Sequence, residues 1–359
     1  MRAVLLPIFS AFVFSHASFA APPNVLIIQT DEHNFRTLGC YRKLLPPDQA
    51  FIWGDGVKVD TPHLDSIAER GAMCTRYYAT SPVCTPSRAA LMTGLYPQNT
   101  GSISNDLPML DSMETFAAVL QGAGYDTGYS GKWHLDGDSK PGWAPKRQFG
   151  WADNRYMFNR GHWKNLGEDE SGPRVAAINA KGEPSYDLAG ADEKSFATDF
   201  LIDRAIEFVK RDRGSNPFCY MVSLPDPHGP NTVRPPYDTM FDPAPFQQPK
   251  SALAKGDRLP SFAQVMEDRF NARQMALYFG MVKCIDDNVG RLLSVLRETG
   301  QLERTLIVFT SDHGDMCGEH GRHNKGIPCE GSARIPFLIA APGLIPPGAV
   351  IHEALGTVD

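Results

Sequence analysis

Five short, largely apolar runs are spaced along the chain, each bounded by turn-forming residues. Runs of this kind are typical of strands that are covered on both faces of a sheet. They predict strands at residues 24–30, 125–130, 218–224, 305–310 and 335–340. The first of them, NVLIIQT, shows the pattern most clearly.

Between these runs, apolar residues recur at steps of three and four, as on one face of a helix. The steps predict helices at residues 62–70, 113–121 and about 270–298, and Gly300 follows the longest as a stop signal. Alternating strands and helices indicate an α/β fold with a mostly parallel central sheet flanked by helices. Nine prolines between residues 225 and 260 indicate an ordered excursion rather than a flexible linker.

Polar residues follow four of the predicted strands, at the edge where α/β sheets bind ligands. The four strand ends carry carboxylates, histidines and a lysine: Asp31-Glu32-His33, Lys132-Trp133-His134, Asp226-Pro227-His228 and Ser311-Asp312-His313. Carboxylates from two strand ends suit a hard divalent cation, and a histidine is unusual for Ca²⁺, so His313 is expected at the margin of the site. The candidates to hold an anionic group are Arg88, Lys132 and Lys325, with His134 and His228 as proton carriers.

Composition excludes only a few classes of function. The 359 residues are 42% hydrophobic and 21% charged, as in an ordinary globular protein. The net charge of −6 argues against a nucleic-acid-binding protein, which needs a basic face, but it leaves room for a local basic pocket.

The first twenty residues have the form of a secretory signal peptide. Arg2 precedes an apolar run that extends to Phe14, and Ser18 and Ala20 are small residues suited to a cleavage point. The run is too short to span a bilayer, and no later stretch is long and apolar enough to be a transmembrane helix. We therefore expect an exported protein, periplasmic or secreted, with residues 21–359 as its mature α/β domain.

Export changes the interpretation of the seven cysteines, because an oxidising compartment favours disulfides. An odd count leaves at least one thiol with another fate, and without a CxxC pair a structural zinc site has little support. Cys84 stands just before a predicted helix with Pro86 near its first turn, where backbone N–H groups favour an anion. The residues alone are consistent with a thiol whose pKa is lowered by the helix terminus.

Residues 84–88, Cys-Thr-Pro-Ser-Arg, match the Cys-x-Pro-Ser-Arg signature of type I sulfatases. The chain resembles this alkaline-phosphatase-like family in further segments and in the same order: residues 24–40, 61–101, 124–134, 226–228 and 312–325. The resemblance implies a sulfuric ester hydrolase in which a dedicated maturation enzyme oxidises Cys84 to formylglycine. The hydrated aldehyde then supplies the nucleophilic oxygen, and loss of its second hydroxyl proton expels sulfate.

The resemblance also implies roles for individual residues. Arg88 is expected to position the formylglycine, Lys132 to contact the sulfate and His134 to help deprotonate the diol. His228 and Lys325 are expected to bind the sulfate and protonate the leaving alcohol. Ca²⁺, or Mg²⁺, is expected on Asp31, Asp312 and residue 84. Two further expected ligands depart from the family pattern: Glu32 stands where aspartate is common, and His313 stands where asparagine is frequent.

Four of the five tryptophans lie between residues 133 and 163, interspersed with lysines and arginines. Flat aromatic faces beside cations suit a sulfated sugar, whereas simple loop packing explains the same residues equally well. A carbohydrate sulfate is therefore the preferred substrate, with Trp151 and Trp163 as candidate contacts.

The sequence stops at Asp359, whereas sulfatases continue into a smaller C-terminal subdomain, which is therefore expected to be missing. Two alternatives stay open. One is a phosphodiesterase or phosphonate monoester hydrolase of the same superfamily, and the other is a catalytically inactive, truncated binding homologue.

Overall fold

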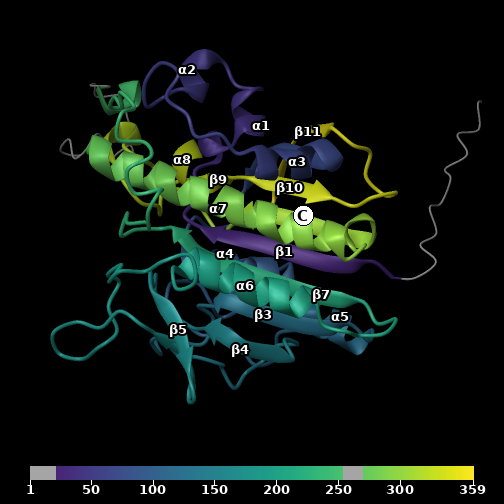
Figure 1. The fold of residues 1–359 in the computed structure, drawn as a ribbon. Helices are drawn as coiled ribbons and strands as arrows, with labels where there is room; N and C mark the ends of the chain where they lie inside the picture. The colour runs from purple at the N-terminus through teal and green to yellow at the C-terminus, as the bar shows by residue number, and fades with distance from the viewer. Residues whose placement is uncertain (1–21, 254–269) are drawn as a thin grey trace, which may run out of the picture.

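A nine-stranded mixed sheet runs through the centre of the computed structural model, which describes residues 22–253 and 270–359 (Figure 1). The predicted signal peptide, residues 1–20, lies outside the described residues. The strand order is β11-β2-β10-β8-β1-β7-β3-β4, and β9 pairs with β2 beside this path. The strands span β1 (Asn24–Asp31), β2 (Ala72–Tyr78), β3 (Asp126–Lys132), β4 (Asp153–Phe158), β7 (Phe218–Pro227), β8 (Thr305–Ser311), β9 (Arg334–Ile335), β10 (Phe337–Ala340) and β11 (Ala349–Gly356).

Parallel pairing at the centre of the sheet brings the important strand ends together. β1 lies between β7 and β8 and is parallel to both, with Ile27 opposite Met221 and Val308. β3 continues the parallel run beside β7, whereas β10 is antiparallel to β8. The predicted fold class, a mostly parallel sheet flanked by helices, is confirmed. The carboxyl ends of β1, β3, β7 and β8 therefore meet at one edge.

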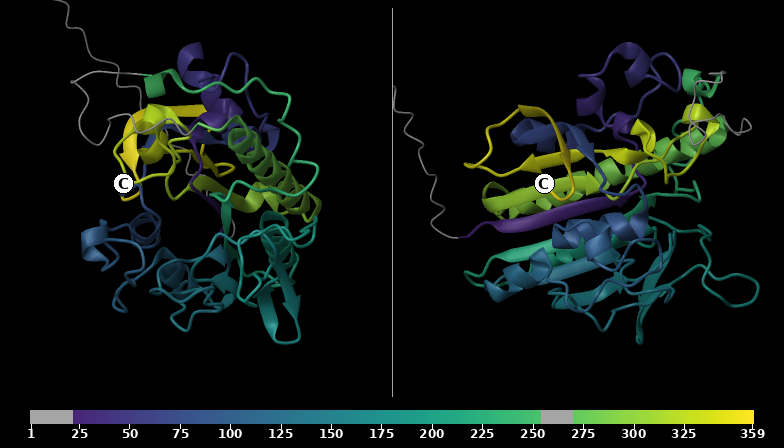
Figure 2. Two further views of the ribbon diagram at one scale, coloured as in Figure 1. Left: turned by 90° about the vertical axis from the view of Figure 1, so that its left-hand side faces the viewer. Right: turned by 180° about the vertical axis from the view of Figure 1, so that it is seen from behind.

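Helices cover both faces of the sheet (Figures 1 and 2). Leu26 and Ile28 pack in one core with residues of α3 (Pro62–Arg70), α6 (Ala197–Val209) and α7 (Ala272–Glu298). Ile27 faces the opposite side, because side chains alternate along a strand, and packs with α4 (Cys84–Thr93) and α5 (Phe116–Gly122). The shorter elements are η1 (Phe35–Thr37), α1 (Gly39–Arg42), α2 (Pro47–Ala50), η2 (Pro97–Asn99), the β5 (Leu166–Asp169) and β6 (Gly172–Val175) hairpin, η3 (Lys250–Leu253), η5 (Leu302–Arg304), η6 (Glu319–Gly321) and α8 (Glu330–Ala333).

Most predicted elements are present, with shifted ends. α3 has its expected bounds, whereas α5 begins three residues late because Thr115 caps it by accepting from the Ala118 N–H. The run at 335–340 is divided into β9 and β10 by Pro336, which has no N–H to donate to the ladder. The proline-rich excursion is largely irregular as far as η3, and its last residues, 254–260, lie outside the described part.

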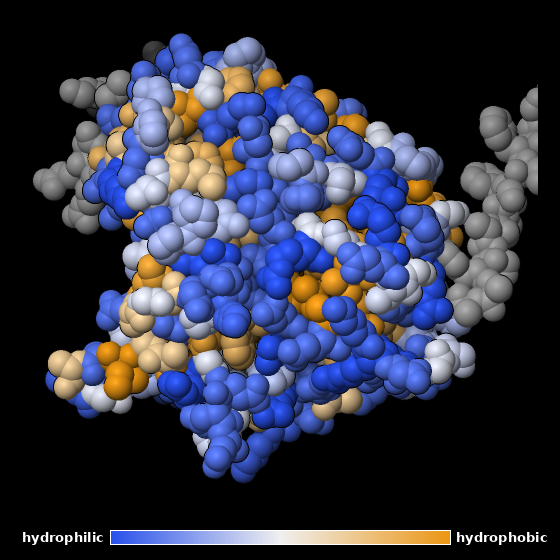
Figure 3. All heavy atoms as spheres, viewed as in Figure 1, coloured by the Kyte–Doolittle hydropathy of each residue, from blue (hydrophilic) through white to orange (hydrophobic). Residues whose placement is uncertain are grey.

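The face shown in Figure 3 is mainly hydrophilic, with smaller hydrophobic patches between the polar residues. Among the helices of the described ranges, none combines the length and apolar character needed to cross a membrane.

A buried ion pair anchors the loop that follows β7. Lys164 Nζ lies 2.6 Å from Asp226 Oδ1 and 2.9 Å from the His228 carbonyl oxygen, and both charged side chains are fully buried. Thr198, in the first turn of α6, donates its hydroxyl to the other Asp226 oxygen at 2.5 Å. The position of His228 therefore depends on this pair.

Lys164→Met removes the partner of a buried carboxylate, so we expect it to lower the free energy of unfolding by about 3–5 kcal/mol. Lys164→Met with Asp226→Asn, which removes both charges, should recover part of that loss. Urea unfolding followed by circular dichroism measures both, with Lys210→Met at an exposed position as the control. A Lys164→Met variant as stable as the Lys210→Met control would contradict this account.

Candidate active site

Arg88, one turn into α4, joins the ends of β1 and β8. Its Nε donates to Asp312 Oδ2 at 2.8 Å, and a terminal nitrogen donates to Asp31 Oδ2 at 3.2 Å. The other terminal nitrogen donates to Ser223 Oγ and to the Lys132 carbonyl oxygen, both at 2.7 Å. Arg88 therefore holds one oxygen of each aspartate and leaves the second oxygen to other partners; Oδ1 of Asp312 also accepts from the backbone N–H groups of His313 and Glu32.

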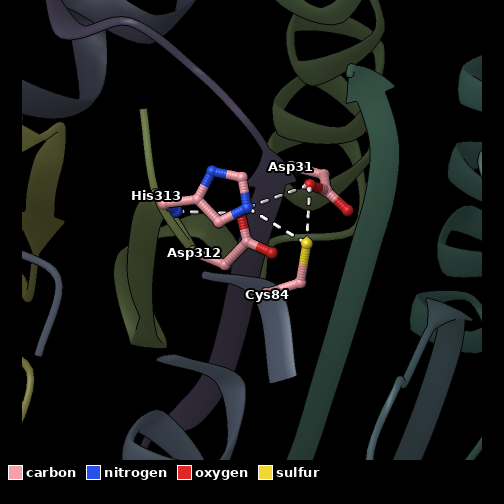
Figure 4. Close-up of side chains that lie close together, drawn as sticks. All are labelled: Asp31, Cys84, Asp312 and His313. Carbon is pink, nitrogen blue, oxygen red and sulfur yellow. Dashed lines mark hydrogen bonds and ion pairs between the residues drawn. The ribbon is translucent and has the colours of Figure 1, made fainter. Parts of the chain in front are cut away.

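The second oxygens of these aspartates face a common point together with Cys84 and His313 (Figure 4). His313 Nε2 lies 3.6 Å from Oδ1 of Asp31, 3.6 Å from Oδ1 of Asp312 and 3.1 Å from Cys84 Sγ. One ligand atom from each of the four residues lies within 4.8 Å of the others, and all four residues are buried. His313 is thus a full member of this group, not a residue at its margin.

The chemistry of this group fits a divalent cation. The Nδ1 of His313 lies 3.0 Å from the Gly314 carbonyl oxygen, so Nδ1 carries a proton and Nε2 faces the carboxylates, where a bound cation would take the place of a second proton. Burial lowers the pKa of His313, but Asp312 and Cys84 outweigh it and raise the pKa to about 10. These surroundings favour positive charge, as a metal site requires. Carboxylates suit Ca²⁺, Mg²⁺ and Mn²⁺, and imidazole adds affinity for transition metals.

Cys84 is the first residue of α4 and points into this group. None of the seven cysteines, all of which lie in the described ranges, forms a disulfide. Burial alone raises the pKa of the Cys84 thiol, but the Lys132 ammonium and His313 bring the pKa below its ordinary value. A buried, unpaired cysteine in contact with a metal-ligand group is suited to modification or coordination rather than to covalent bracing of the fold.

Lys132, the last residue of β3, lies beside this group. Its Nζ is 2.5 Å from Asp31 Oδ2 and 2.8 Å from His162 Nε2. Asp31, His162 and His228 could by themselves hold a second cation. The Lys132 ammonium already supplies positive charge between Asp31 and His162, which disfavours a cation at this second group.

A second ionic cluster joins Glu32, His228 and Lys325. His228 Nε2 lies 2.9 Å from Glu32 Oε2 and 2.5 Å from Lys325 Nζ, and Lys325 Nζ is 3.3 Å from the same carboxylate. Burial raises the pKa of Glu32, but His228 and Lys325 bring it down to about 2. His228 Nδ1 faces the Gly229 carbonyl oxygen at 2.8 Å, so Nε2 is the nitrogen that can exchange a proton.

Glu32 as a metal ligand stays a prediction, because its side chain lies outside the group of Asp31, Cys84, Asp312 and His313. Glu32 has a φ of 66°, and its carboxylate turns toward His228 and Lys325 instead of joining Asp31 and Asp312. Oε2 of Glu32 faces the two cationic side chains, whereas its buried Oε1 has no hydrogen-bond partner among the described residues.

His134 lies near the end of the same β3 segment and is almost fully buried. Burial, followed by the Lys132 and Arg88 charges, lowers the pKa of His134 to about 2, so its imidazole is neutral. Its Nε2 lies 3.0 Å from Asp106 Oδ1. The structure thus brings the six predicted catalytic residues to one edge of the sheet, while their individual roles remain predictions: Cys84, Arg88, Lys132, His134, His228 and Lys325.

The two tryptophans predicted to bind substrate are core residues instead. Trp151 is fully buried and packs edge-on against Phe116 and Tyr129. Trp163 is 1% exposed and lies against Tyr186, with ring centroids 4.7 Å apart. Neither ring presents a face to a ligand, so the interpretation as loop packing replaces that of sugar contact.

Two residues of the site have no counterpart in the sequence prediction, His162 and Asp106. His162 follows β4, and its ring stacks on His228 with centroids 3.4 Å apart. β4 reads DNRYMF and lacks the apolar run that marked the other strands. Recognising it as the parallel neighbour of β3 would have placed the residues after Phe158 beside those after Lys132.

A model of the sulfatase family matches residues 23–359. The chain belongs to the sulfatase family. Its alkaline-phosphatase-like fold also resembles a solved structure in complex with D-glucosamine-2-N,6-O-disulfate, with a TM-score of 0.74, 22% identity, and coverage of 94% of this chain and 75% of the other.

Curated relatives agree with this family assignment. A choline-sulfatase from Rhizobium meliloti is 33% identical over 90% of this chain, and an ulvan-active sulfatase from Formosa agariphila is 29% identical over 94% of it. The chain spans 64% and 60% of the length of these two relatives.

If the group of Asp31, Cys84, Asp312 and His313 holds one divalent cation, His313→Ala should weaken metal binding by at least about tenfold. Losing a residue that only orients a metal ligand typically costs about that much, and losing a ligand should cost no less. Metal content after gel filtration and titration calorimetry measure the loss. Asp287→Asn is the control, because Lys283 already pairs with both acids of the His63, Asp286 and Asp287 group. Equal metal binding by wild type and His313→Ala would contradict the assignment.

Proposed function

We propose that this chain hydrolyses sulfate esters through a formylglycine formed from Cys84 by a maturation enzyme, assisted by a divalent cation. The observation that carries the proposal is the position of the signature cysteine. Cys84 lies among two buried aspartates and His313, with Lys132 near enough to lower its pKa. A tetrahedral dianion or monoanion bound there meets cationic groups on several sides.

Each residue of the site has its own role in the proposed reaction. A formylglycine at position 84 would, as its hydrate, supply an oxygen nucleophile, and a bound cation would offset negative charge near it. Asp31, Asp312 and His313 would hold the cation. Lys132 and Lys325 bind the sulfate oxygens, and His228, whose Nε2 can release a proton, protonates the departing alcohol.

The metal is proposed to be Ca²⁺, with Mg²⁺ as the second choice, because two carboxylates dominate the group. Mn²⁺ should also be tested when the metal is added back, because His313 contributes a nitrogen ligand and nitrogen ligands suit transition metals.

A sulfated carbohydrate is the proposed substrate. One relative is named for activity on ulvan, a polysaccharide, and a partly exposed aromatic residue lies beside the site. Tyr186 lies 5.9 Å from His162 between ring centroids, and Lys140 Nζ is 4.5 Å from the centroid of the tyrosine ring. An aromatic face next to a cation suits a sulfated sugar ring. The choline-sulfatase relative provides the competing small substrate.

Parallel assays on matched esters test the reaction class. Metal-loaded protein, co-expressed with a formylglycine-generating enzyme, should hydrolyse an aryl sulfate faster than the corresponding phosphonate monoester or phosphate diester. Cys84→Ala should reduce hydrolysis to background, and His228→Ala should lower kcat by about 10²–10⁴-fold because it removes a general acid.

Faster turnover of the phosphorus esters would favour a phosphonate monoester hydrolase or phosphodiesterase. Absence of turnover of every ester by the modified, metal-loaded chain would favour an inactive binding homologue. Near-normal rates in His228→Ala would reject the proton-transfer role.

Sulfated monosaccharides, sulfated oligosaccharides and choline sulfate, compared by kcat/KM, test the substrate class. Tyr186→Ala should raise KM for a sulfated sugar by about three- to tenfold and leave aryl sulfate unchanged. Tyr96→Ala, at an exposed tyrosine beyond the other end of α4, is the control. Choline sulfate as the best substrate, with no effect of Tyr186→Ala on sugars, would contradict the carbohydrate proposal.

Export to the periplasm or medium is also proposed, on the basis of the apolar N-terminal run. N-terminal sequencing of the protein from its host should find residue 21 or a near neighbour first. An intact Met1 would contradict export by this route.

A further inference from the structure

A loop between α4 and α5 supplies a carboxylate to His134. His134 Nε2 lies 3.0 Å from Asp106 Oδ1, and Arg160 holds the other Asp106 oxygen at 2.9 Å. The His134 side chain is 5% exposed, whereas Asp106 and Arg160 are 31% and 39% exposed. The three residues thus lead from the buried site to its surface.

The loop and the histidine are both tied to Thr85, the residue after Cys84. The Thr85 hydroxyl donates to the His134 carbonyl oxygen at 3.0 Å, and the Thr85 N–H donates to Asn105 Oδ1 at 3.1 Å. Both His134 and Asp106 have positive φ, 61° and 67°, which few non-glycine residues adopt. Such backbone conformations cluster at functional sites, where the surroundings hold them in place.

The contact with Asp106 determines which nitrogen of His134 bears the proton. A carboxylate only accepts hydrogen bonds, so the Nε2 of a neutral imidazole must carry the hydrogen. The Nδ1 then carries the lone pair, and this buried atom has no hydrogen-bond partner among the described residues. His134 therefore has an unengaged proton acceptor inside the site.

We propose that Asp106, held by Arg160, is a positioning residue that keeps His134 in the Nε2–H tautomer with Nδ1 as the proton acceptor. The proposal rests on the proposed function, in which His134 accepts a proton from the group at position 84. In addition, a residue outside the Cys-x-Pro-Ser-Arg motif sets the tautomer of His134, and Nδ1 is the nitrogen that accepts the proton.

Arg160 fixes how the side-chain amide of an Asp106→Asn variant must be oriented. In Asp106→Asn the guanidinium can only donate, so the amide oxygen must stay on Arg160 and the amide NH₂ must face Nε2. His134 then has to accept at Nε2 and carry its proton on Nδ1, the wrong tautomer. Removing Arg160 as well frees the amide to turn its oxygen to His134.

The experiment combines imidazole NMR with kinetics on the full-length, metal-loaded protein. Long-range ¹H–¹⁵N spectra of ¹⁵N-histidine-labelled protein, with His134→Gln to identify the signal, report the tautomer directly. We expect Nε2–H in wild type and Arg160→Leu, Nδ1–H in Asp106→Asn, and a return to Nε2–H in Asp106→Asn with Arg160→Leu. Asp111→Asn, an exposed acid paired with Arg147, is the control and should match wild type.

Turnover of an aryl sulfate should follow the tautomer: kcat falls by about 10²-fold or more in Asp106→Asn, with little change in KM, and recovers in the double variant. An Nε2–H signal in Asp106→Asn would overturn the proposal, as would an unchanged kcat in a variant with the Nδ1–H tautomer. The NMR result stands even if wild type cleaves no sulfate ester, so failure of the proposed function and failure of the tautomer assignment are distinguishable.

Discussion

The contact of one guanidinium with two buried carboxylates is the constraint on which the site depends. Asp31 ends β1, Asp312 follows the adjacent parallel strand β8, and neither side chain is exposed to solvent, while Arg88 between them is 1% exposed. Two buried anions without a cation would cost several kcal/mol each. Because Arg88 uses one oxygen of each acid, the remaining oxygens converge, and because Arg88 is one turn after Cys84, residue 84 lies beside them.

Around this centre, each proton-carrying group contacts a carboxylate. Lys132 contacts Asp31 and His162, His228 shares Glu32 with Lys325, and His134 faces Asp106. These different surroundings shift the pKa values of His134 and His228 in opposite directions. Burial and the nearby cations keep His134 neutral, which leaves a lone pair on its ring, whereas Glu32 and Asp31 outweigh the effect of burial and raise the pKa of His228, which suits proton donation.

Strand ends could be predicted from sequence because apolar runs are a strong signal and parallel topology gathers their carboxyl ends. That reasoning located Asp31, Lys132, His228 and Asp312. The direction of a side chain was beyond it. Oε2 of Glu32 faces His228 and Lys325, outside the group formed by Asp31, Cys84, Asp312 and His313, and no residue pattern encodes that direction.

Residues from irregular segments were missed for a related reason. Asp106 and His162 come from a loop and from the end of a polar strand, and only the tertiary fold brings them to the site. The tryptophans illustrate the opposite error, because their composition suits both a sugar site and a core. Burial decided between these interpretations.

The most direct test of the whole account is mass spectrometry of the peptide that contains residue 84, taken from the protein as its own host makes it. The account predicts formylglycine at this position. An unmodified Cys84 thiol in otherwise mature protein would contradict the proposed nucleophile and with it the catalytic role of the site.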